Sequence, residues 1–117
     1  MKSIIIGVRY LQKMGIVHRD LKPDNIILIN KTTASEKYET KIKIIDFGFS
    51  IMKECLKDIS VQENSVGTPN FIPPEFLPLE YHEENYDNLE KSDNFAVGCI
   101  TYYILTGHLP FLANSIE

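Results

Sequence analysis

A chain of 117 residues has the length of about one small domain. Its share of apolar residues, 44%, and its share of charged residues, 24%, are typical of a soluble globular protein, and the chain contains no internal repeat or low-complexity tract. The net charge of −4 at pH 7 argues against a nucleic-acid-binding protein, because such proteins usually carry a basic patch.

The distribution of cysteines and apolar residues narrows the class of protein further. Cys55 and Cys99 lack the C-x-x-C spacing of a metal or redox site, and the three histidines are too scattered for a zinc site, so we expect two reduced thiols. The longest apolar run, 95–105, is too short to cross a bilayer, and Arg9 interrupts the apolar start too early for a signal peptide. These features predict a cytoplasmic or nuclear protein with no membrane and no nucleic-acid partner.

The first half of the chain predicts one helix and two strands. Apolar residues recur at helical spacing over 2–14, so we expect a helix that ends at Gly15. Residues 16–25, with a proline and several charges, are typical of a loop. Apolar runs at 26–29 and 41–45 predict two strands, the first of them buried, and the polar residues between them predict an exposed hairpin connection.

The second half predicts one long irregular connection and one long helix. The segment 46–74 has no clear periodicity, and connections of such length are uncommon in compact domains unless they are functional. A short helix is expected near 74–77, an acidic solvated segment at 82–88, and a final helix at 92–107 with Ser92 as its cap. Because two strands cannot cover both apolar helices, we expect this chain to be part of something larger.

One segment of the predicted loop, His18–Asn25 (HRDLKPDN), gathers three side chains with complementary chemistry. Asp20 can accept a proton from a hydroxyl group, and the side-chain oxygen of Asn25 is a hard ligand of the kind that Mg²⁺ binds. Lys22 lies between them in the sequence and can neutralise charge on a phosphoryl group in transfer. Singly, each residue would be a surface group in a loop, but the three together before a strand indicate a functional site.

A second group follows the second predicted strand. Asp46 stands directly after Ile45, and a carboxylate at a strand end can bind a cation that bridges phosphates. Gly48 permits a sharp backbone turn there. Asp-x-Gly also marks ordinary turns, so the segment Asp46–Gly48 (DFG) gains its significance from the first group on the neighbouring strand.

Two segments near the end of the long connection complete a pattern. These are Gly67–Pro69 and Pro73–Glu75, and Asp93 follows at the start of the last helix, where alone it would equally suit a helix cap. In this order, the segments resemble the H-R-D catalytic loop, the D-F-G segment and the A-P-E segment of the eukaryotic protein kinases. The resemblance covers nearly the whole chain, although Pro73 replaces the alanine of A-P-E.

The resemblance implies an α+β fold, the mainly helical C-lobe of the protein-kinase fold with a short β-hairpin between the catalytic loop and DFG. Residues 1–117 would be a partial protein kinase domain, with the catalytic loop at 16–25, the DFG and activation segment at 46–75 and a helix of the lobe core at 92–107. The chain contains no Gly-rich loop and no strand lysine of the family's smaller lobe. We therefore expect the N-lobe to be absent and the fragment to be inactive alone.

The resemblance also assigns the residues that would handle substrate and nucleotide. Asp20 would orient the hydroxyl of a protein substrate and accept its proton, and Lys22 would contact the γ-phosphate of ATP. Asn25 and Asp46 would hold Mg²⁺, and Ile27 would form the floor of the adenine pocket. The implied function is transfer of the ATP γ-phosphate to serine or threonine hydroxyls of proteins.

Five more residues receive positioning roles from the resemblance. His18 and Phe47 would stack in a hydrophobic column anchored by Asp93. Thr68 would lie in the loop that cradles the substrate residue after the phosphoacceptor. Glu75 would form a buried ion pair with an arginine beyond this chain.

The resemblance suggests how the activation segment is controlled. Arg19 would pair with a phosphate on this segment, but the family's usual phosphosite falls on Asn64, which cannot be phosphorylated. Its neighbour Glu63 carries a fixed negative charge and is the favoured partner, whereas Ser65 would serve only after phosphorylation. In a third alternative neither residue pairs with Arg19.

The subgroup follows from shorter matches. Lys22-Pro23 and Gly67–Pro69 resemble serine/threonine kinases rather than tyrosine kinases. The phrase KIKIIDFGFS at 41–50 and the polar insertion before it resemble the calcium/calmodulin- and calcium-dependent kinases, which implies calcium-linked regulation through regions outside this chain. A kinase-like binding or regulatory lobe without turnover is the alternative, and a small-molecule phosphotransferase is disfavoured by the same segments.

Overall fold

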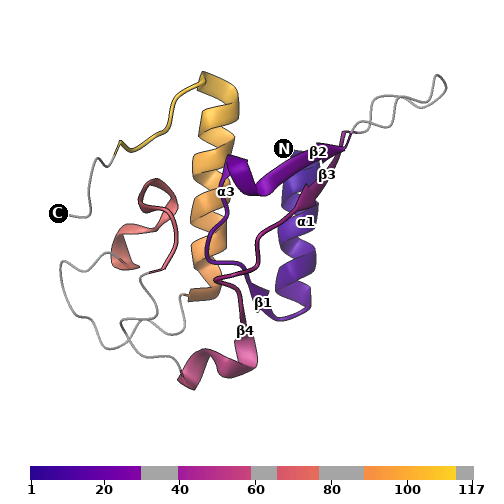
Figure 1. Ribbon diagram of the computed structural model, residues 1–117. Coiled ribbons are helices and arrows are strands. Elements are labelled where there is room, and N and C mark those ends of the chain that lie inside the picture. The colour runs from indigo at the N-terminus through magenta and orange to yellow at the C-terminus, as the bar shows by residue number, and fades with distance from the viewer. Residues whose placement is uncertain (30–39, 59–65, 77–88, 113–117) are drawn as a thin grey trace.

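The computed structural model describes residues 1–29, 40–58, 66–76 and 89–112 (Figure 1). The helices and strands in these ranges are α1 (Lys2–Lys13), β1 (Ile16–Val17), β2 (Ile26–Ile29), β3 (Lys41–Ile44), β4 (Ile51–Met52) and α3 (Leu89–Thr106). Short 3-10 helices lie between them, and these are η1 (Pro23–Asn25), η2 (Lys53–Asp58), η3 (Pro69–Phe71) and η4 (Pro74–Phe76). The predicted connection over 30–39 and the acidic segment 82–88 lie outside the described residues.

Helix α1 forms where the apolar periodicity predicted it. Ile4, Val8 and Leu11 are buried at intervals of about one helical turn, so they form one apolar face. Gly15 ends the helix with a φ of +68°, a left-handed conformation that glycine adopts without a side-chain penalty. Its amide donates to the carbonyl of Gln12 at 3.0 Å, which satisfies one of the carbonyls left at the helix end.

The main core lies between α1 and α3. The two helices stand side by side in Figure 1, with the strand β1 near the lower end of α1. Ile4 and Val8 of α1 pack into one buried cluster with Leu21 of the intervening loop and Ile100 of α3. A single core therefore holds the loop after β1 in place.

Helix α3 corrects a prediction about its start. It begins at Leu89 rather than at Ser92, and the Ser92 hydroxyl donates to the Leu89 carbonyl at 2.7 Å within the helix. Asp93 also lies inside the helix, so neither residue is its cap. Helical periodicity missed the first turn because the predicted boundary followed the apolar run, which begins later.

Strands β2 and β3 pair antiparallel as the hairpin prediction requires, with Ile26 opposite Ile44 and Ile29 opposite Lys41. The prediction that β2 is buried is wrong, because Ile27 is 45% exposed and the next two residues are also exposed. The ribbon contacts α1 through β3, and the side chain of Ile44 packs against Gly7. A Cβ atom added at Gly7 would lie 3.1 Å from this side chain, so the close contact depends on glycine. β2 is thus the outer strand of a two-stranded ribbon.

A second small sheet lies in segments that were predicted to be irregular. β1 and β4 pair antiparallel, with Ile16 opposite Met52 and Val17 opposite Ile51. A strand of two residues shows no alternation that a sequence pattern could reveal. The short helix expected near 74–77 is present as η4. No helix in the described ranges is long and apolar enough to cross a membrane.

Candidate active site

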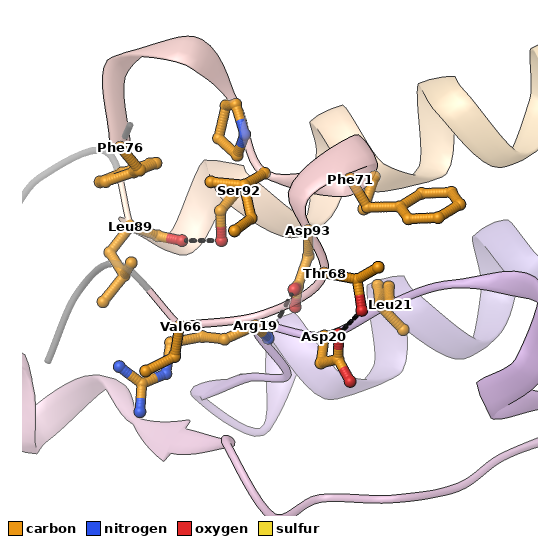
Figure 2. Close-up of a pocket in the computed structure, with 13 residues that line it drawn as sticks. Arg19, Asp20, Leu21, Val66, Thr68, Phe71, Phe76, Leu89, Ser92 and Asp93 are labelled. Carbon is orange, nitrogen blue, oxygen red and sulfur yellow. Dashed lines mark hydrogen bonds between the residues drawn. The ribbon is translucent and has the colours of Figure 1, made fainter. Parts of the chain in front are cut away.

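Asp93 fixes the backbone of the loop that carries the candidate site. Its two carboxylate oxygens accept hydrogen bonds from the amides of His18, at 2.8 Å, and Arg19, at 3.0 Å. Figure 2 shows the bond from Arg19. Arg19 has a φ of +66°, which a residue with a side chain adopts only at an energetic cost, and these two bonds stabilise it. Burial raises the pKa of the Asp93 carboxyl, while the two amide donors act in the opposite direction.

His18 connects the loop to the segment after β3. Its buried ring donates from Nε2 to the carbonyl of Ile45 at 3.0 Å, and its Nδ1 accepts from the amide of Asp20 at 3.3 Å. A carbonyl can only accept, so Nε2 is the nitrogen that carries a proton in this contact. The ring also packs against Phe47, with ring centroids 4.8 Å apart and planes tilted by 59°. The two rings are therefore in contact but tilted, and the hydrophobic column expected from the resemblance stays a prediction.

The carboxylate of Asp20 lies at the centre of a four-residue network. One oxygen accepts from the Thr68 hydroxyl at 2.7 Å (Figure 2), and the other accepts from the Lys22 ammonium at 3.1 Å and from the Asn25 amide at 3.2 Å. Lys22 also donates to the Thr68 hydroxyl at 2.9 Å. Both oxygens of Asp20 act as acceptors, so the network holds the carboxylate in one orientation.

Asn25 and Asp46 present oxygen atoms suited to a hard cation. The Asn25 amide nitrogen donates to the Asp20 carbonyl at 2.8 Å as well as to its carboxylate, which leaves Oδ1 as the acceptor atom of this side chain. Asp46 is exposed, and only its Oδ1 accepts the amide of Gly48, at 3.3 Å. The amide of Ile45 donates to the Asn25 carbonyl at 3.0 Å, which ties the chain before Asp46 to the loop.

This donor set fits Mg²⁺ in the way that phosphate-bound Mg²⁺ is usually held. Among the described residues, no group of three or more His, Cys, Asp and Glu side chains gathers at one point. Mg²⁺ commonly takes one or two protein oxygens and completes its shell with water and substrate phosphates. Asn25 and Asp46 would supply the protein share.

Gly67 allows its segment of the chain to approach the loop that holds Arg19 and Asp20. Its φ is +121°, and a Cβ atom there would lie 2.5 Å from the carbonyl oxygen of Arg19, so any side chain would clash with the backbone. This close approach brings the neighbouring Thr68 within reach of Asp20. The role of Gly67 was not predicted, because a glycine before Thr-Pro has the same sequence signature as an ordinary turn.

A small cavity lies behind this contact, between the loop, the activation segment and the start of α3 (Figure 2). Its volume of about 20 Å³ has room for about one water molecule, so it is no substrate pocket. The residues that close it include Val66, Phe76 and Leu89. The apolar lining keeps the activation segment packed onto the helix that carries Asp93.

The remaining predicted site residues lie apart from this network. Ile27 is exposed on the ribbon, opposite Lys43 in the register. Arg19 donates from Nε to the carbonyl of Phe49 at 2.5 Å, which links it to the residue after DFG. Glu75 is exposed on η4, and the ion pair with an arginine beyond this chain stays a prediction. The predicted regulatory pair, Glu63 and Ser65, lies outside the described residues.

Comparison with known proteins decides the family. The family model described as "Protein kinase domain" matches residues 1–117. The chain belongs to the protein kinase domain family. The fold agrees, because a crystal structure of the Rad53 kinase domain and SCD2 superimposes with a TM-score of 0.62 and 29% identity, covering 96% of this chain and 32% of the other.

Several protein kinases are similar to this kinase chain in sequence. Death-associated protein kinase dapk-1 of Caenorhabditis elegans is 38% identical over 115 residues, which are 97% of this chain and 7% of the relative. Smooth muscle myosin light chain kinase of Gallus gallus is 37% identical over 98% of this chain and 5% of the relative. Myosin light chain kinase family member 4 of Mus musculus is 39% identical over 98% of this chain and 26% of the relative. The chain thus spans a small part of each relative's length.

Proposed function

We propose that this chain provides the catalytic lobe of a serine/threonine protein kinase, which transfers the γ-phosphate of ATP to serine or threonine hydroxyls of proteins. The observation that supports this most directly is the network in which Thr68, Lys22 and Asn25 hold the carboxylate of Asp20. We further propose 16–25 as the catalytic loop and 46–75 as the DFG and activation segment.

The network gives each side chain a chemical role. The fixed carboxylate of Asp20 would accept a hydrogen bond from the substrate hydroxyl and then its proton, as the oxygen attacks the γ-phosphorus and ADP leaves. Lys22, whose ammonium lies 3.1 Å from that carboxylate, would contact the γ-phosphate and offset its charge. Asn25 and Asp46 would hold Mg²⁺, which neutralises phosphate charge when it is bound.

The similarity to death-associated and myosin light chain kinases, together with the segments Lys22-Pro23 and Gly67–Pro69, supports serine/threonine over tyrosine substrates. The similarity to death-associated and myosin light chain kinases supports placement in the calcium/calmodulin-dependent group. We also propose that calcium controls the kinase through regions outside residues 1–117. The location that we propose is cytoplasmic or nuclear.

The test is phosphoryl transfer by a two-lobe chimera, in which residues 1–117 follow the N-lobe of mouse myosin light chain kinase family member 4. With radiolabelled ATP, Mg²⁺ and a basic serine peptide, we expect transfer by the chimera and none by the 117-residue chain alone. Asp20→Asn keeps the size of the side chain but removes the proton acceptor, so transfer should fall by roughly a thousandfold or more.

Two results would contradict the proposal. Transfer that is unchanged by Asp20→Asn would exclude Asp20 as the proton acceptor. A folded chimera that binds ATP but transfers no phosphate would favour the alternative, a kinase-like binding lobe without turnover.

A further inference from the structure

The turn that follows Asp46 is closed by two hydrogen bonds to one carbonyl. The carbonyl of Phe47 accepts the amide of Ser50 at 3.0 Å and the hydroxyl of Ser50 at 2.7 Å. One amide bond between residues three apart is enough to close such a turn. The hydroxyl adds a second bond to a carbonyl that the backbone already satisfies, so closure of the turn does not account for it.

The Phe47 carbonyl belongs to the same peptide group as the amide of Gly48. That amide donates to Oδ1 of Asp46 at 3.3 Å. A peptide group is planar, so its carbonyl and its N–H point in opposite directions and rotate together. A contact that fixes the Phe47 carbonyl therefore also fixes the hydrogen bond to the Asp46 carboxylate.

The conformation of this peptide group is easily lost. Asp46 has a φ of +63°, a left-handed conformation that costs energy in a residue with a side chain. Gly48 has no side chain to hinder rotation of the peptide group before it. A Cβ atom at Gly48 would lie 3.2 Å from Oδ1 of Asp46, so the carboxylate packs closely against the glycine. The orientation of the carboxylate thus depends on the contacts that hold this peptide group.

The neighbouring contacts hold other parts of the turn. The ring of Phe47 packs against the ring of His18, with centroids 4.8 Å apart. The carbonyl of Phe49 accepts from Nε of Arg19 at 2.5 Å. In the described part of the chain, Ser50 supplies both bonds to the Phe47 carbonyl.

We propose that Ser50 is a positioning residue for the Mg²⁺ site, which holds the Asp46 carboxylate through the peptide group between Phe47 and Gly48. The inference rests on the proposed function, in which Asp46 and Asn25 hold Mg²⁺. The amide of Gly48 binds Oδ1 of Asp46, and Oδ2 remains for the cation. Without the Ser50 hydroxyl the peptide group rotates more readily, and the carboxylate loses its fixed orientation. Cation binding must then restore that orientation, which lowers the affinity.

The experiment measures cation affinity directly, with Mn²⁺ as the probe because electron paramagnetic resonance reports its free concentration. It uses a full-domain chimera, in which residues 1–117 replace the segment that they match in mouse myosin light chain kinase family member 4, so that the rest of that kinase can cover the exposed apolar faces. With one equivalent of ADP, Ser50→Ala should weaken Mn²⁺ binding by about threefold to tenfold, because one hydrogen bond that orients a ligand is lost. Ser50→Thr keeps the hydroxyl and should bind within about twofold of the unaltered chimera.

Ser3→Ala is the matched control, because the Ser3 hydroxyl also donates to a backbone carbonyl, that of Thr40, at 2.6 Å. This bond joins α1 to the residue before β3, so its loss should change the Mn²⁺ affinity by less than about twofold. Circular dichroism shows whether each variant retains its helices. In phosphoryl transfer, Ser50→Ala should raise the Mg²⁺ concentration for the half-maximal rate by the same factor and leave the KM for the peptide unchanged.

Unchanged Mn²⁺ affinity in Ser50→Ala, or an equal loss in Ser50→Thr or in Ser3→Ala, would overturn Ser50 as a positioning residue. The proposed function would survive that result if the unaltered chimera transfers phosphate. An unaltered chimera that binds Mn²⁺ no more tightly than ADP alone does would instead contradict the proposed Mg²⁺ site, and with it both the proposed function and this inference.

Discussion

At the scale of single residues, Thr68 joins the segment 46–75 to the loop 16–25, which we propose as the activation segment and the catalytic loop. Its hydroxyl donates to Asp20 and accepts from Lys22, so one oxygen atom links the proposed proton acceptor to the cation beside it. The contact exists only because Gly67, without a side chain, lies against the carbonyl of Arg19. Movement of the activation segment would therefore remove a hydrogen bond from the carboxylate that chemistry requires in a fixed orientation.

We predict that Thr68→Val and Thr68→Ser separate the hydroxyl from the shape of the side chain. In the two-lobe chimera, valine preserves the volume but loses both hydrogen bonds, so kcat should fall on the order of tenfold to a hundredfold. Serine retains the hydroxyl and should stay within about threefold of the original rate. Steady-state kinetics with a serine peptide provides the measurement, and a valine variant as active as the serine variant would show that the hydroxyl does not support Asp20.

At the scale of elements, patterns longer than one helical turn were predictable and shorter ones were not. Helix α1 and the pairing of β2 with β3 follow from periodicity and from the polar segment between the strands. The pairing of β1 with β4 depends on residues far apart in sequence, so no local pattern reveals it. Burial of β2 was predicted wrongly because an apolar run predicts that a strand forms but does not show whether another element packs over it.

The candidate site shows the same division. The grouping of Asp20, Lys22 and Asn25 was predictable because residue type and spacing within one loop carry it, and their chemical roles stay predictions. The bonds from Asp93 to the amides of His18 and Arg19 depend on how α3 packs against the loop, and spacing alone was equally consistent with a helix cap. Contacts between distant elements therefore required the structure, or the resemblance to a family, to become visible.

Asp93 joins two elements, and we predict that its contribution to stability depends on pH. Burial raises its pKa above the ordinary value of 3.8, so the folded protein binds the proton more tightly than the unfolded protein does. This contribution to the free energy of unfolding is fully present below pH 3.8 and is lost as the pH rises through the raised pKa. The advantage of the original protein over Asp93→Asn should therefore narrow between acidic and neutral pH.

Urea unfolding of the two-lobe chimera and its Asp93→Asn variant, at several pH values from about 4 to 7, tests this dependence. Because all other titrating groups are common to both proteins, the difference between them isolates Asp93. The variant should be less stable throughout, since asparagine turns a donor toward one of the two amides. A difference that grows with increasing pH would mean that the two amide donors outweigh burial.

At the scale of the whole molecule, apolar side chains lie exposed on several elements. The carboxyl-terminal part of α3 exposes Tyr102, Tyr103, Ile104 and Leu105, the last by 77%, and Leu112 beyond it is 82% exposed. β2 and the outer face of α1 add further exposed apolar residues. Monomeric soluble proteins rarely expose contiguous apolar patches larger than a few hundred Å².

We predict that the 117-residue chain alone self-associates or melts without a sharp transition. Burial of apolar surface contributes about 25 cal/mol per Å², and the free energy of unfolding of a domain is only about 5–15 kcal/mol. Apolar surface that stays exposed therefore lowers the stability of the monomer and favours self-association. At tens of micromolar, sedimentation velocity should show species larger than a monomer, and Leu105→Glu with Leu112→Glu should reduce them. Lys41→Glu with Lys43→Glu adds negative charge on β3 instead and serves as the control, which should change self-association less. A monomer that melts sharply and reversibly would show that the exposed face of α3 needs no cover.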